Sequence, residues 1–150
     1  MTMQWDKVRA FLDGWFTSSK FEAGLLDGIW FGETTFDETK TSRGKTTVLK
    51  TSVMFRKSFR PGNRLTTEFK FKYADGDTHQ ITQTGRWTLS DGKLTTVLSD
   101  QYGETHAEYW MLKLAKNMHT YRSVGDNKYY IAKKATERLE SKWHDFLPDS

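Results

Sequence analysis

The chain has 150 residues and carries 23 basic against 19 acidic side chains, for a net charge of +4. This length is typical of a single domain with a sizeable core, and the charge is well short of what nucleic-acid binding requires. Cysteine is absent, which excludes disulfides, thiolate nucleophiles and cysteine-ligated metals and fits a reducing compartment. We therefore expect one domain in the cytoplasm, and we do not expect nucleic acid as a partner.

The first residues predict an amphipathic helix. Trp5, Val8, Phe11, Leu12 and Trp15 recur at spacings of three and four, which places them on one stripe of a helix. Charged residues interrupt the stretch, so it holds neither the apolar core of a signal peptide nor a membrane span. We expect an N-terminal helical segment within residues 1–26 that packs on the rest of the domain.

Short segments of alternating apolar and polar residues follow, separated by turn sequences such as Asp75-Gly76 and Asp91-Gly92. They predict eight strands, over residues 28–36, 46–55, 65–73, 78–89, 94–99, 105–114, 118–123 and 128–133. The polar residues 37–44, between the first two strands, are expected to form a loop at the mouth of a barrel.

The remaining residues predict a C-terminal amphipathic helix over 135–147, with Leu139, Trp143 and Phe146 on one face and Pro148 at its end. Strands joined by such short turns leave two sheet edges exposed unless the sheet closes on itself. We therefore predict an all-β fold, an eight-stranded antiparallel up-and-down barrel over residues 27–134 with an N-terminal and a C-terminal α-helix.

Hairpin register indicates which side chains face the interior, because residues opposite each other point to the same face. Across Asp91-Gly92 the predicted pairs are Leu89 with Leu94, Trp87 with Thr96 and Gly85 with Leu98. A three-residue loop over 75–77 pairs Phe71 with Ile81 and Phe69 with Gln83. A turn at Lys116-Asn117 pairs Leu114 with His119 and Leu112 with Tyr121, and the alternation continues inward through Trp110, Glu108 and His106.

This predicted interior holds more polar groups than a sealed core, and buried polar atoms need partners. Either a ligand supplies these partners in a cavity, or the side chains satisfy one another in a filled barrel. The candidate ligand-binding residues are Gln83, Trp87, His106, Glu108, Trp110, His119, Tyr121 and Tyr130.

The sequence Gly28-Ile29-Trp30, between a helix and an eight-strand meander, resembles the lipocalins and the wider calycin superfamily, including bacterial lipocalin-like cytosolic proteins. In lipocalins this Trp packs at the closed end of the barrel beneath an Arg near the last strand. Here Lys133 and Lys134 occupy that end of the last strand, with Arg138 a little beyond. The resemblance implies a lipocalin-like domain with a small-molecule pocket that opens opposite Trp30.

Three functions remain open for such a barrel. We favour binding of a small, mostly apolar ligand in the lumen. One alternative is a cofactor-free isomerase, cyclase or lyase acting on a hydrophobic molecule there, with His119, Glu108 and Tyr121 as catalytic candidates. The other is a protein-interaction module with a filled barrel. No cofactor is predicted, and no metal site, because histidines isolated in strands more often make one hydrogen bond than bind a metal.

The densest basic cluster consists of Arg56, Lys57, Arg60 and Arg64, which no acidic residue interrupts. It could attract an anion, but solvated charges on a loop are the expected arrangement. We therefore predict that these four side chains lie on the surface at one rim of the barrel.

Overall fold

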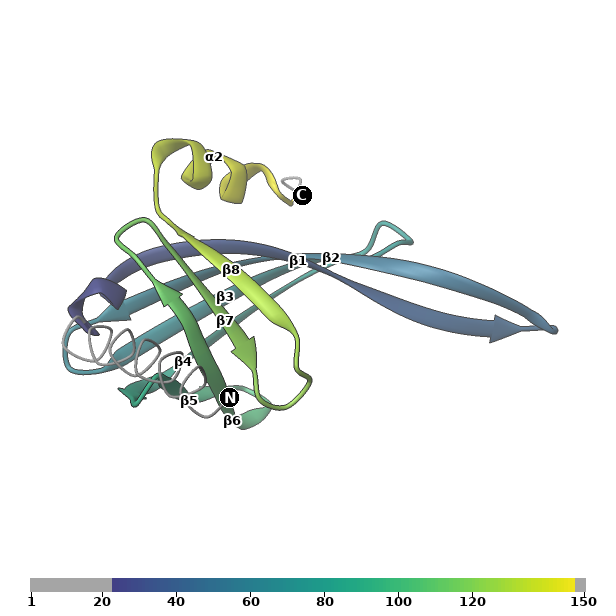
Figure 1. Cartoon of the computed structure of the whole chain (residues 1–150). Helices are drawn as coiled ribbons and strands as arrows, with labels where there is room; N and C mark the ends of the chain where they lie inside the picture. The colour runs from purple at the N-terminus through teal and green to yellow at the C-terminus, as the bar shows by residue number, and fades with distance from the viewer. Residues whose placement is uncertain (1–22, 148–150) are drawn as a thin grey trace, which may run out of the picture.

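The computed structural model describes residues 23–147 and shows an eight-stranded antiparallel sheet closed into a barrel (Figure 1). Each strand pairs with the next along the chain, and the last pairs with the first. The strands are β1 (Gly28–Ser42), β2 (Lys45–Arg60), β3 (Arg64–Lys72), β4 (Thr78–Ser90), β5 (Lys93–Asp100), β6 (Gly103–Leu114), β7 (Met118–Ser123) and β8 (Tyr129–Lys134). The predicted up-and-down barrel is confirmed.

Helical structure flanks the barrel at both ends of the described chain. A single 3-10 turn, η1 (Ala23–Leu26), precedes β1, and the predicted C-terminal helix is present as α2 (Glu137–Asp145). The predicted N-terminal helix falls on residues 1–22, outside the described part. Within the described residues no helix is long and apolar enough to cross a bilayer, and the cytoplasmic location stays a prediction.

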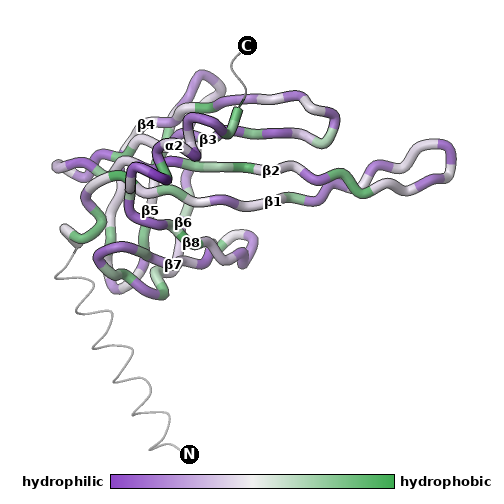
Figure 2. The backbone as a smooth tube through the Cα atoms, turned by 90° about the horizontal axis from the view of Figure 1, so that it is seen from above, coloured by the Kyte–Doolittle hydropathy of each residue, from purple (hydrophilic) through white to green (hydrophobic). Residues whose placement is uncertain are grey.

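The first hairpin differs most from the prediction. Residues 37–44 are not a loop: β1 and β2 stay paired out to Ser42 and Lys45, and the turn is Arg43-Gly44. Both turn residues have positive φ, 53° and 76°, the geometry of a tight two-residue hairpin. The paired strands project beyond the barrel as an arm, mostly hydrophilic toward its tip (Figures 1 and 2). Thr favours extended backbone, so a polar composition did not require a loop.

The turn at Asp91-Gly92 follows the prediction. Both residues have positive φ, 53° and 77°, and the pairs Leu89 with Leu94, Trp87 with Thr96 and Gly85 with Leu98 are confirmed. The β3–β4 register was wrong by two residues, since Phe71 pairs with His79 and Phe69 with Ile81. A shift of two keeps every side chain on its predicted face, so Phe69, Phe71 and Gln83 still point inward.

A bulge in β6 reverses the predicted orientation of half of that strand. Leu114 pairs with His119 as expected, but the register shifts between Met111 and Lys113, so Met111 rather than Leu112 pairs with Tyr121. One extra residue moves each earlier side chain to the opposite face. Met111 is fully buried, whereas Leu112 is exposed.

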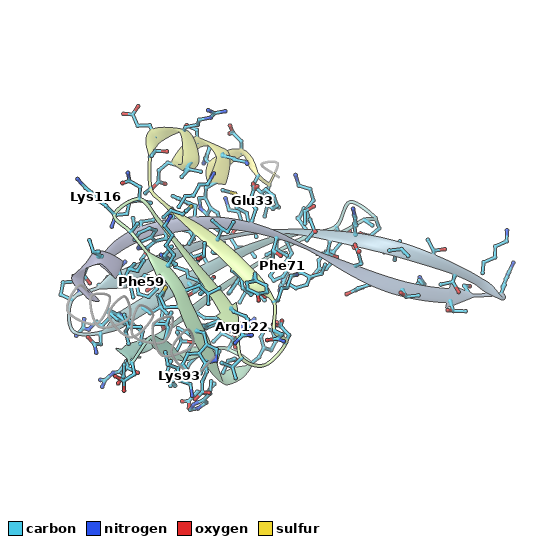
Figure 3. All side chains as sticks on the ribbon, in the orientation of Figure 1. Glu33, Phe59, Phe71, Lys93, Lys116 and Arg122 are labelled. Atoms are coloured by element: carbon cyan, nitrogen blue, oxygen red, sulfur yellow. The ribbon has the colours of Figure 1, made fainter. Side chains whose placement is uncertain are left out.

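The core fills the end of the barrel opposite the arm. Trp30 is fully buried there and donates from Nε1 to the Leu26 carbonyl oxygen at 2.8 Å. Phe59 packs edge-on against Trp87, with ring centroids 5.4 Å apart. Figure 3 labels Phe59 at this closed end and Phe71 toward the opposite end, from which the arm projects. Side chains thus seal one end of the barrel and leave the other for a site.

A second apolar cluster fixes α2 to the outer face of the barrel. Trp143, the buried residue of α2, packs with Phe31 and Met54. Lys70 Nζ donates to the Trp143 carbonyl oxygen at 2.5 Å and lies 4.3 Å from its ring centroid. The Thr136 side chain caps the helix by accepting from the Leu139 N–H.

Candidate functional site

The open half of the barrel contains a cavity of about 260 Å³. Its wall is mostly apolar and aromatic, from alternate residues of nearly every strand. The lining residues are Thr34, Phe36, Val53, Phe55, Lys57, Leu65, Thr67, Phe69, Phe71, Gln83, Thr96, Leu98, Thr105, Ala107, Tyr109, Tyr121 and Tyr130. The cavity lies beyond the sealed core, at the end away from Trp30.

The cavity wall contains one cationic residue, Lys57 of β2. Its side chain follows Val53 and Phe55 on the inward face of the strand and is only 7% exposed. Lys57 Nζ donates to the Tyr121 hydroxyl at 2.7 Å, and no carboxylate of the described residues forms an ion pair with it. Burial lowers the pKa of Lys57 from 10.5 to about 7.

Aromatic rings surround this amine. Lys57 Nζ lies 4.4 Å from the ring centroid of Tyr121, 5.2 Å from Phe55 and 5.3 Å from Tyr109. Cation–π contacts favour the charged ammonium by about 0.5–2 kcal/mol each. Removing an ion from water costs several kcal/mol, and this desolvation lowers the pKa of Lys57.

Three tyrosines share the wall around Lys57. Tyr121 stacks on Tyr130 with centroids 5.2 Å apart and meets Tyr109 edge-on at 5.1 Å. Burial raises the pKa of all three hydroxyls, that of Tyr121 well above 10. The phenols therefore stay protonated at neutral pH and can donate hydrogen bonds.

The predicted site residues fall into three groups. Gln83, Tyr121 and Tyr130 line the cavity. Trp87 and His119 face inward but belong to the core at the closed end, outside the cavity wall. Gln83 Nε2 also donates to Asp100 Oδ2 at 3.0 Å, which fixes the amide toward the rim.

The prediction that His106, Glu108 and Trp110 point inward was wrong, because the β6 bulge turns them outward. His106 contacts Glu104 at 2.5 Å, Glu108 pairs with Lys93 at 3.1 Å, and all three side chains are exposed. Their neighbours Thr105, Ala107 and Tyr109 line the cavity instead.

The separation of these side chains bears on catalysis and metal binding. His106 and Glu108 lie outside and His119 lies in the core, so the three do not converge. Within residues 23–147 no three His, Asp or Glu side chains are grouped to hold a metal ion. Of the three catalytic candidates, Tyr121 alone reaches the cavity wall.

Lys57, the most distinctive residue of the site, was predicted to lie on the surface with the other residues of the basic cluster, and this prediction was wrong. The predicted surface cluster is divided by β2, which continues to Arg60. Arg56 faces outward, where it binds Glu68 at 2.7 Å and reaches Glu140 of α2 at 3.7 Å, while Lys57 faces inward. The alternation of Val53, Phe55, Lys57 and Phe59 was the available signal, because it places the lysine on the apolar face.

The closed end of the barrel contains a cation, Lys134, beside Trp30. Lys134 Nζ lies 4.7 Å from the Trp30 ring centroid and donates to the Asp27 carbonyl oxygen. Gly28 permits this approach: its φ is 116°, and a Cβ there would lie 2.5 Å from Lys134 Nζ. The glycine and tryptophan of the motif thus act together with this lysine.

The sequence matches no family model and no curated protein. Among solved structures, the chain is similar to the crystal structure of a lipocalin-like protein from Bacteroides uniformis, with 15% sequence identity and a TM-score of 0.41. The match covers 75% of this chain and 100% of that chain. The closed, eight-stranded, up-and-down topology described above is itself lipocalin-like.

Proposed function

We propose that this lipocalin-like barrel binds a small, mostly apolar molecule in the open half of its lumen, with a polar group of the ligand beside Lys57. The observation that carries the proposal is the cavity of about 260 Å³, whose apolar wall contains a single buried amine. Convergent polar groups in an otherwise apolar cavity are typical of small-molecule sites.

The dimensions favour a small ligand. Sites for drug-sized molecules span about 300–1,000 Å³, and this cavity lies just below that range. A two-ring aromatic or a medium-length aliphatic chain with one polar end matches both the volume and the aromatic wall. The side chains of residues 23–147 leave this space open, which argues against a filled interaction module.

The geometry favours binding over the cofactor-free enzyme. A catalytic proton carrier must lie within hydrogen-bond reach of the substrate. His119 is sealed in the core and Glu108 is in solvent, so neither is placed to serve a molecule in the cavity. Lys57 and Tyr121 are the polar pair that a ligand meets.

The test is a calorimetric titration with 2-naphthalenemethanol, together with mass spectrometry of molecules extracted from the purified protein. We expect saturable binding with one site per chain. Ala107→Trp, which places an indole in the cavity, should weaken affinity by about tenfold or more, about 1.4 kcal/mol. Glu108→Trp adds the same group on the outer face of the same strand and should leave affinity unchanged.

Two results would contradict the proposal. One is the absence of both a co-purifying ligand and saturable binding. The other is equal binding by wild type and by a folded Ala107→Trp variant, since the site would then lie elsewhere.

A further inference from the structure

We propose that Lys57 captures carbonyl compounds, so that the lumen takes an apolar aldehyde and holds it as an imine on the Lys57 amine. The inference rests on the proposed lumen binding and specifies the chemistry of the polar end of the ligand. It depends on three features of Lys57: its position in the cavity wall, the lack of a carboxylate partner within the described chain, and the hydroxyl beside it.

The position of Lys57 supplies the nucleophile. An amine attacks a carbonyl only in its neutral form, and a lysine with the ordinary pKa of 10.5 is almost entirely protonated at pH 8. Burial brings the pKa of Lys57 to about 7, so the neutral amine is its major form at pH 8. The charged groups nearby do not restore the ammonium, because the described residues place no carboxylate in an ion pair with it.

The hydroxyl beside the amine supplies a proton donor. Tyr121 accepts a hydrogen bond from Lys57 Nζ at 2.7 Å, and its raised pKa keeps its own proton in place. Tyr121 can therefore donate a hydrogen bond to the carbonyl oxygen and, as negative charge develops on that oxygen, pass on its proton while it accepts one from the nitrogen.

The reaction balances without any further reagent. The Nζ lone pair attacks the carbonyl carbon, the π electrons move to oxygen, and a proton transferred from nitrogen to oxygen gives a carbinolamine. The carbon–oxygen bond then breaks, and the oxygen leaves as water with the second N–H proton. One aldehyde and one amine thus give one imine and one water, with no change of oxidation state.

The apolar wall stabilises the product. An imine in water hydrolyses readily, whereas an apolar site limits the access of water. The ring centroids of Phe55 and Tyr109 lie 5.2 and 5.3 Å from Nζ, so apolar rings flank the amine that would carry the imine. The chain thus combines an activated amine with the surroundings that an imine needs.

The experiment uses 2-naphthaldehyde as the probe and sodium cyanoborohydride to fix any imine as a stable amine. The full chain is incubated with both at pH 8, and modified lysines are located by peptide mass mapping. We expect one dominant adduct at Lys57, about tenfold or more above any exposed lysine, because its pKa of about 7 makes its neutral fraction at pH 8 far larger than that of a lysine with the ordinary pKa of 10.5. Lys57→Met should remove the adduct, and Lys113→Met, which removes an exposed lysine on the outer face of β6, should not.

Two further readouts keep the test decisive. The yield at Lys57 in the wild type should rise to half its maximum near pH 7, which requires no variant to fold. Tyr121→Phe should slow trapping by a larger factor than it weakens binding of 2-naphthalenemethanol, because the hydroxyl takes part in the proton transfer.

Adducts spread over the exposed lysines, or unchanged in Lys57→Met, would overturn the inference. If 2-naphthalenemethanol binds but the aldehyde does not attach to Lys57, the imine proposal is wrong and the proposal of lumen binding stands. If neither probe binds, both proposals fail.

Discussion

His119 is a buried base without a hydrogen-bond partner in the part of the chain that the structure describes. Its ring is fully buried 4.4 Å from the Trp30 centroid, and neither ring nitrogen has a partner among the described residues. Burial, and then the charges of Lys57 and Lys134, lower its pKa from 6.5 to about 3. The histidine therefore stays neutral in the fold at any moderate pH.

This lowered pKa makes stability depend on pH. Between pH 6.5 and 3 the unfolded chain binds a proton at residue 119 that the folded chain does not, so the free energy of unfolding falls as pH falls. The slope is about 1.4 kcal/mol per pH unit, which amounts to about 2 kcal/mol between pH 6.5 and 5. Well above pH 6.5 His119 is neutral in both states and contributes no slope.

His119→Leu should remove this part of the pH dependence. At pH 7 we expect a change in unfolding free energy within about 1 kcal/mol, because relief of unpaired polar atoms offsets the lost aromatic contact with Trp30. Urea denaturation at pH 7, 6 and 5 measures both effects, with His106→Leu on the exposed face as the control. An unchanged slope in His119→Leu would show that the histidine is not held neutral.

At the scale of elements, the alternation of apolar and polar residues predicted most strands, but it did not predict the bulge in β6. The Asp91-Gly92 hairpin follows from its sequence because two positive-φ residues determine both turn type and register. Nothing local marks the β6 bulge: Leu112 looks like a core residue, and its exposure depends on which residue of β7 lies opposite. The candidate site consequently contained three outward side chains and omitted Lys57, whose strand was predicted to end too early.

The attachment of α2 gives a prediction at this scale. Trp143→Ala removes the buried ring that contacts Phe31 and Lys70, and should lower the free energy of unfolding by about 3 kcal/mol. His144→Ala, on the exposed side of the helix, should change it by less than about 0.5 kcal/mol. Urea denaturation gives both values.

Because α2 packs on the outside, Trp143→Ala should leave the cavity intact. Calorimetry with 2-naphthalenemethanol should therefore give the wild-type affinity for both helix variants. A loss of binding in Trp143→Ala alone would mean that the helix shapes the lumen.

At the scale of the whole molecule, the barrel closes through a short seam. β1 and β2 pair along fifteen positions, from Gly28 with Phe59 to Ser42 with Lys45, whereas β1 and β8 share two, Trp30 with Lys134 and Phe31 with Lys133. Beyond Phe31, β1 pairs with β2 alone, although its Thr34 and Phe36 still line the cavity. Because this seam has the fewest paired positions, we expect the barrel to open there first.

Lys134 stabilises this seam through its side chain as well as through its backbone pairing with Trp30. Its amine lies over the Trp30 ring and donates a hydrogen bond to the Asp27 carbonyl oxygen. Lys134→Met should therefore lower the free energy of unfolding by about 1–2 kcal/mol, because it removes a charged hydrogen bond and a cation–π contact. Hydrogen exchange should accelerate at the Ala135 amide, which donates to the Ile29 carbonyl oxygen at 2.9 Å across the seam, and stay slow between β3 and β4. Lys133→Met changes the exposed neighbour on the same strand and should affect neither region. Faster exchange spread evenly over all eight strands would instead indicate that the barrel opens as one unit.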